Sequence, residues 1–139
     1  MSDAIISIKP KHVKNILSGE KTVELRTRTV SLPTGSKLWV YSTLPVGRVE
    51  LSTVIDFVDV LPPSEMWLKH GKSICISKKE FDEYTDGRNL VSAIGLRNID
   101  PIKRDLCLKT MRGYEKNFQP PQFFSRLSPE RALYSAFYS

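Results

Sequence analysis

The stretch Lys9–Arg26, KPKHVKNILSGEKTVELR, decides the fold, because it sets a short helix directly before a strand. Pro10 suits the first turn of a helix, where its missing N–H would have no partner anyway. Gly19 stands where a helix commonly ends in a left-handed residue. Three apolar residues between them recur at helical spacing and predict one face packed on a core: Val13, Ile16 and Leu17.

The second half of this stretch changes from a period of 3.6 to a period of two, which predicts a half-buried strand. Val23 and Leu25 form its apolar side, and Lys21 opens the strand on that side, at the rim of the core. The opposite side is polar and carries Thr22, Glu24 and Arg26. An ordinary solvated face with a surface ion pair, contributing about 0–1 kcal/mol, is the simpler interpretation. A ligand-binding face is the alternative.

The rest of the chain predicts more strands and short helices in one domain, residues 1–139. We expect further strands at 4–8, 37–42, 48–60 and 90–96, and a turn at 98–101. We expect further helices at 62–71, 78–84, 103–111 and 129–138, the last being a C-terminal helix. Five to six strands with short peripheral helices predict an α+β fold built on a small mixed β-barrel.

Composition and charge narrow the function classes. A net charge of +6 favours polyanionic partners, nucleic acid before membrane, and the lack of a long apolar run predicts no membrane partner. Residues 1–8 lack the pattern of a signal peptide, and two cysteines are too few for a disulfide framework, so a cytoplasmic protein is expected. No motif predicts a cofactor or a metal site, and His12 is expected to be solvated on the flank of its helix.

The string KP-x-H-V-x-x-I-L-S-G-E-K-T-V-E-L-R at Lys9–Arg26 resembles the opening of the ASCH domain family, a branch of the PUA-like fold. Two later pieces resemble the family in the same order: Leu38–Thr43 with Pro45 and Gly47, and Pro120–Phe124 with Leu127. The resemblance covers about residues 5–127. It implies a PUA-like barrel that binds RNA or a modified base.

The leading hypothesis is therefore a nucleic-acid-binding module with a basic cleft beside the GEKTVELR strand. Its ligand is RNA, another single-stranded nucleic acid or a modified nucleoside. Lysine and arginine neutralise phosphates, polar groups read base edges, and aromatic rings stack bases. The candidate residues are Lys9, Lys21, Thr22, Glu24, Arg26, Arg28, Tyr41, Ser42, Thr43, Gln122 and Phe123.

Two alternatives stay open. The resemblance also implies an RNA-directed hydrolase, because similar family members are ribonucleases or amidohydrolases of N4-acetylcytidine. Lys21 matches the amidohydrolase lysine, but the threonine nucleophile three residues later is Glu24 here. A Lys21–Glu24 acid/base pair acting on RNA is the catalytic version of this hypothesis. The second alternative is a protein-interaction or transcription-associated adaptor that docks through 103–118 and the terminal helix.

Overall fold

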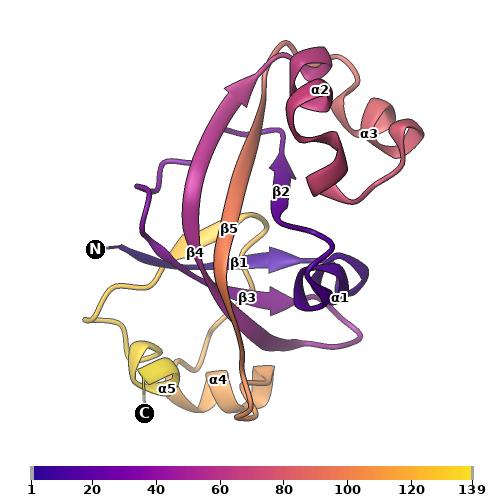
Figure 1. Ribbon diagram of the computed structural model, residues 1–139. Coiled ribbons are helices and arrows are strands. Elements are labelled where there is room, and N and C mark those ends of the chain that lie inside the picture. Colours follow the sequence, from indigo (N-terminus) through magenta and orange to yellow (C-terminus); the bar gives the residue numbers. More distant parts are fainter. Residues whose placement is uncertain (1, 139) are drawn as a thin grey trace.

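One strongly curled sheet runs through the protein, and helices lie around it (Figure 1). The computed structural model describes residues 2–138. The strands are β1 (Asp3–Ile8), β2 (Val23–Arg26), β3 (Lys37–Ser42), β4 (Arg48–Leu61), β5 (Val91–Pro101) and β6 (Phe124–Arg126). The helices are α1 (Pro10–Ser18), α2 (Pro63–Ile74), α3 (Lys78–Thr85), α4 (Leu108–Tyr114) and α5 (Tyr134–Tyr138).

The sheet has the order β2-β5-β4-β3-β1-β6. β1 runs parallel to β3, and the other neighbours are antiparallel. Among residues 2–138, β2 and β6 are the two edges and do not pair with each other. The predicted α+β class with five to six strands is confirmed, in the form of a half-barrel that stays open between β2 and the β1–β6 pair.

The helix and strand predicted in the opening stretch are both present. α1 begins at Pro10 and ends before Gly19, which takes a left-handed φ of 87° and donates its N–H to the Ile16 carbonyl at 3.1 Å. β2 follows after four residues and pairs antiparallel with β5. The chain therefore reverses tightly, and the start of α1 comes close to β2.

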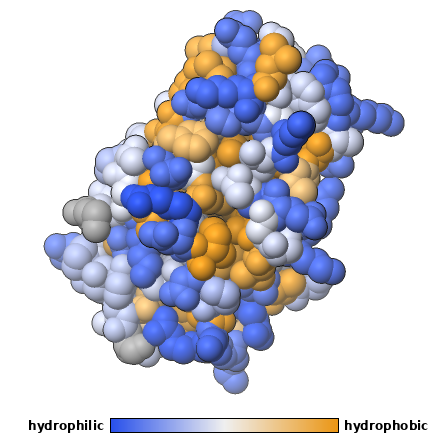
Figure 2. Space-filling model, viewed as in Figure 1, coloured by the Kyte–Doolittle hydropathy of each residue, from blue (hydrophilic) through white to orange (hydrophobic). Residues whose placement is uncertain are grey.

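Both faces of β3 are buried, in the middle of the sheet. β3 contributes Leu38 and Val40 to one core cluster and Trp39 and Tyr41 to another. α4 and α5 cover the second cluster, whereas α2 and α3 lie at the other end of the sheet (Figure 1). Apolar surface remains in the middle of the face viewed in Figure 2, bordered by hydrophilic side chains. Because β3 is covered on both sides, its residues from Leu38 to Tyr41 are apolar or aromatic without alternation.

Three predictions in the C-terminal half need correction. The turn expected at 98–101 is the end of β5, because β4 is long enough to pair as far as Leu51 with Pro101. The helix expected at 103–111 is α4, 108–114, and the one expected at 129–138 is α5, 134–138. Before α5, the Arg131 guanidinium binds the Glu115 carboxylate and the Arg126 carbonyl, which holds this segment in turns. None of the helices in residues 2–138 has the length and apolar character needed to cross a membrane.

Candidate functional site

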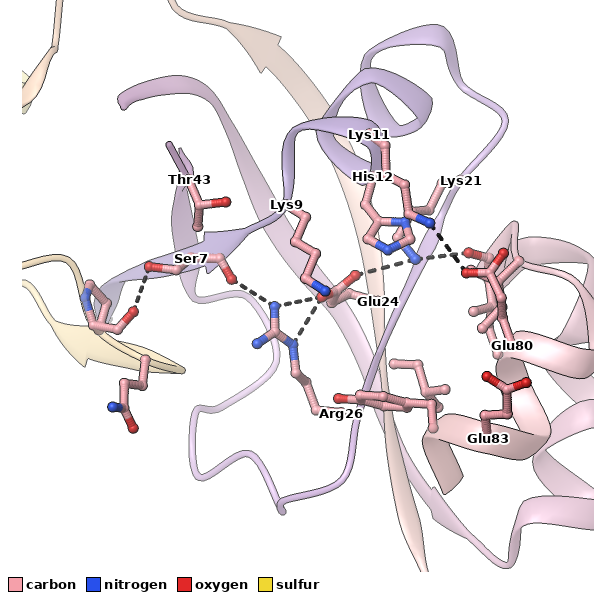
Figure 3. Close-up of a pocket in the computed structure, with 16 residues that line it drawn as sticks. Ser7, Lys9, Lys11, His12, Lys21, Glu24, Arg26, Thr43, Glu80 and Glu83 are labelled. Carbon is pink, nitrogen blue, oxygen red and sulfur yellow. Dashed lines mark hydrogen bonds and ion pairs between the residues drawn. The ribbon is translucent and has the colours of Figure 1, made fainter. Parts of the chain in front are cut away.

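A cavity of about 640 Å³ lies where the half-barrel is open, between α1, β2 and α3 (Figure 3). β2 supplies Glu24, Leu25 and Arg26, and α3 supplies Glu80, Glu83 and Tyr84. Lys11 and His12 come from the first turn of α1, and Lys9 directly precedes that helix. The remaining lining residues are Ser7, Lys21, Thr43, Ile74, Ile76, Pro121 and Gln122. We call this cavity the cleft.

Lys21 lies beneath the cleft, with only 2% of its surface exposed. Its ammonium donates to the carbonyls of Val23 and Ile74, both at 2.8 Å, and lies 3.2 Å from Glu24 Oε1. These three acceptors match the three hydrogens of the ammonium group. The predicted position of Lys21 at the rim of the core is wrong, because the end of α2 covers Lys21 and accepts one of its hydrogen bonds.

Glu24 forms the centre of a buried ion triad. Its Oε2 accepts from Arg26 Nε at 2.9 Å and from Arg26 Nη2 at 2.6 Å, while Oε1 faces Lys21. The same Nη2 donates to the Ser7 carbonyl at 2.8 Å, so Arg26 bridges β2 and β1 across the open side of the sheet. Its guanidinium lies over the Phe123 ring, 5.1 Å from the centroid. Glu24 and Arg26 are paired, but in a buried position and not as a surface pair.

The mouth of the cleft carries both signs of charge. Lys9 and Lys11 are exposed on the α1 side, and Glu80 and Glu83 are exposed on the α3 side. Lys11 Nζ and Glu80 Oε2 approach each other to 3.3 Å across the mouth, as Figure 3 shows. The two walls of the mouth therefore differ in sign.

His12 lines the cleft and is half-buried, so the expectation that it is solvated is wrong. Burial is the main cause that lowers the pKa of His12 below its ordinary value of 6.5, and the nearby Lys21 ammonium lowers it further. The imidazole is therefore neutral at pH 7. Its Nδ1 is shielded from solvent and makes no hydrogen bond to the described residues.

The structure brings six of the candidate residues together in the cleft: Lys9, Lys21, Glu24, Arg26, Thr43 and Gln122. Phe123 adjoins it beneath Arg26. Four others do not line it: Thr22 and Arg28 are exposed elsewhere, and Tyr41 and Ser42 are buried in β3. Tyr41 packs in the core cluster under α4 and α5, and burial raises its pKa.

Ten lining residues were not among the candidates. Four of them are apolar, Leu25, Ile74, Ile76 and Pro121, and six carry polar groups: Ser7, Lys11, His12, Glu80, Glu83 and Tyr84. The spacing of Glu80, Glu83 and Tyr84 at i, i+3 and i+4 predicts a shared helix face. It carries no signal that this face meets a strand more than fifty residues earlier. Within residues 2–138, no three His, Cys, Asp or Glu side chains gather in a metal-binding arrangement, and Cys75 and Cys107 are free thiols.

Comparison with known proteins places the chain in a family. Residues 3–116 match the family described as a domain of unknown function, DUF365. An ASCH domain-containing ribonuclease of Zymomonas mobilis is 31% identical over 128 residues, which cover 92% of this chain and 86% of that protein.

Solved structures agree with this placement. The crystal structure of ASCH from Zymomonas mobilis matches with a TM-score of 0.88 and 31% identity, over 96% of this chain and 94% of that one. Human THYN1, solved in complex with DNA containing 5-methylcytosine, shares the fold with a TM-score of 0.58 at 12% identity, over 99% of this chain and 97% of that one. The chain therefore belongs to the DUF365 family and, together with the Zymomonas mobilis protein, to the ASCH domain family.

Proposed function

We propose that the cleft binds one nucleotide of a single-stranded nucleic acid, RNA in preference to DNA. The base lies against Glu24 and Arg26, and the phosphate lies near Lys9 and Lys11. The observation that carries this proposal is the buried Glu24 carboxylate, held by two cations at the bottom of an open cavity. A purely structural ion triad needs no cavity above it.

Glu24 and Arg26 keep hydrogen-bonding capacity toward the cleft. A carboxylate offers about four lone-pair sites, and three are used here by Lys21 and Arg26. Arg26 Nη1 makes no hydrogen bond to the described residues. A carboxylate acceptor next to a guanidinium donor suits the edge of a base that carries both an N–H and an acceptor. The cavity volume lies in the range of small-molecule sites.

The rim of the cleft supplies cations for the phosphates and an aromatic ring for the bases of a single-stranded nucleic acid. Lys9 and Lys11 are exposed cations for phosphate oxygens, and Tyr84 offers a half-exposed ring for stacking. RNA is preferred in the proposal because the Zymomonas mobilis relative is named a ribonuclease. The complex of THYN1 with 5-methylcytosine DNA makes a modified nucleoside the alternative ligand to test.

The test is the affinity of the full chain for a fluorescently labelled single-stranded RNA, for DNA of the same sequence and for N4-acetylcytidine. Lys9→Gln should weaken RNA binding about three- to tenfold and lower the log–log salt slope by about 0.7, the value for one phosphate contact. Lys14→Gln is the matched control, because Lys14 is also exposed, on the helix that Lys9 precedes, but does not line the cleft. Equal effects of the two variants, or no RNA binding by the wild type, would overturn the proposal.

An RNA hydrolase is the second candidate, favoured by the relative named a ribonuclease. Lys21 is poorly suited to be the base, because proton abstraction would require it to give up one of its three contacts. The neutral His12 is the cleft residue suited to take the proton of the 2′-hydroxyl. The 2′-oxygen then forms a bond to phosphorus, the bond from phosphorus to the 5′-oxygen breaks, and water protonates the leaving oxygen.

The hydrolase candidate predicts RNA fragments with cyclic phosphate ends, produced by the wild type and not by His12→Gln. RNA that stays intact with the wild type excludes it and leaves the binding function. The amidohydrolase version has no support at residue 24, where Glu24 is engaged by Lys21 and Arg26.

A further inference from the structure

We propose that Glu80 and Glu83 keep the phosphate backbone on the α1 side of the cleft, so that only the base end of a nucleotide reaches α3. These two residues would then determine the orientation of the ligand. The inference rests on the proposed nucleotide-binding function, which it extends from Glu24 and the α1 lysines to the opposite wall.

The position of α3 is fixed by the core and not by the mouth. Phe81 is buried in the cluster that also holds Val23 and Leu25 of β2. Lys21 binds the Ile74 carbonyl at the end of α2, four residues before α3 begins. With Phe81 facing the core, the face that carries Glu80, Glu83 and Tyr84 borders the cleft. In Figure 3, Glu80 and Glu83 lie across the cavity from Lys9.

This arrangement gives the cleft opposite signs at its two sides. A phosphate near the α1 side meets Lys9 and Lys11, whereas a phosphate near α3 meets two carboxylates and is repelled. A base has no net charge, and its N–H groups can donate to those carboxylates. A nucleotide, anionic at one end and rich in donors at the other, therefore has one favoured orientation. Repulsion of the wrong orientation contributes to specificity as much as attraction of the right one.

Glu80 and Glu83 act in different ways. Glu80 lies 3.3 Å from Lys11, and both side chains are more than half exposed, so the ion pair is weak and can be displaced by a phosphate. Glu80 thus repels a phosphate near α3, as Glu83 does, and in addition competes with the phosphate backbone for Lys11. Glu83 has no ion-pair partner among the described residues, so its effect on a phosphate is direct repulsion.

Three single variants of the full chain separate these effects. Glu80→Gln and Glu83→Gln each remove one charge from the cleft wall. Asp82→Asn removes one charge from the same helix, but Asp82 is exposed, pairs with Lys78 and does not line the cleft. The probes are a short single-stranded RNA and the same ribose-phosphate backbone without its bases. Circular dichroism confirms that each variant is folded.

Glu80→Gln and Glu83→Gln should tighten RNA binding about two- to fivefold, the range expected for one exposed charge, while Asp82→Asn changes it little. The gain should be larger for the base-free backbone, so that the preference for the normal RNA falls. In a Lys11→Gln background, Glu80→Gln should lose the part of its effect that comes from releasing Lys11, whereas Glu83→Gln should keep its full effect.

The inference is overturned if the two cleft variants behave like Asp82→Asn, or if the preference for bases is unchanged. In both cases the wild type still binds RNA, and the proposed function stands. A folded wild type that binds neither probe overturns the proposed function, and this inference with it.

Discussion

Replacing Glu24 by glutamine should destabilise the protein by about 3 kcal/mol. The change leaves Lys21, 2% exposed, and Arg26, 15% exposed, without their counter-charge. Breaking a buried ion pair by removing one partner costs about 3–5 kcal/mol. The lower end applies here, because Lys21 keeps two carbonyl acceptors, Arg26 keeps the Ser7 carbonyl, and the amide oxygen still accepts a hydrogen bond.

Urea unfolding at neutral pH measures this cost. The midpoint should fall by about 1–2 M with an unchanged slope, and the melting temperature should fall by about 10 °C. Asp82→Asn is the control, because its pair with Lys78 is more than half exposed and contributes at most about 1 kcal/mol. The double variant Lys21→Met/Glu24→Gln should lose less than the two single losses added together. A Glu24→Gln variant as stable as the control would refute the reasoning that the triad is buried and coupled.

Two further changes test the fold and the pH response. Gly95→Ala should lower the free energy of unfolding by about 2 kcal/mol, because the new Cβ would lie 2.1 Å from the Phe57 ring. Gly113→Ala in α4 meets open space and should raise it by about 0.5–1 kcal/mol. Thermal melts of the two variants and the wild type measure both effects. His12→Gln should make the protein less sensitive to acid. The folded pKa of His12 lies below 6.5, so its neutral form stabilises the fold fully above pH 6.5, and this contribution is lost as the pH falls through 6.5 toward the lowered pKa. Urea midpoints at pH 7.5 and 5.0 should therefore differ more in the wild type than in the variant.

Local patterns in the sequence predict a helix or strand correctly where the residues of that element alone determine its conformation. Pro10 and Gly19 mark the two ends of α1, and the alternation from Lys21 to Arg26 predicts β2. The same patterns fail at Asn98, which has a left-handed φ of 54° inside β5, because pairing with the long β4 overrides the local preference for a turn. The conformation of such a segment depends on strands that are distant in the sequence and pair with it.

The site was predictable only in part, for the same reason. Lys9, Glu24 and Arg26 belong to one stretch, and their approach follows from one helix and one strand. Glu80 lines the cleft because α3 packs on the core, and no short-range sequence pattern predicts that packing. Tyr41 is an aromatic residue of the kind that stacks on bases, but α4 and α5 pack over its side of β3. Only the tertiary structure reveals that these helices bury it.

The open side of the half-barrel has a consequence for how this family can diversify. The cleft lies next to the core and is not a cavity within it. Its rim is made of an edge strand and helix surfaces that would be exposed to solvent in any case. Rim side chains such as Lys9, Lys11, Glu80 and Glu83 can therefore be exchanged during evolution without leaving empty space among packed residues. By contrast, Lys21, Glu24 and Arg26 both line the cleft and form the buried ion triad, so changes at these residues would also affect folding. Substitutions at the rim of the cleft can thus change which ligand the fold binds, while the packed core stays the same.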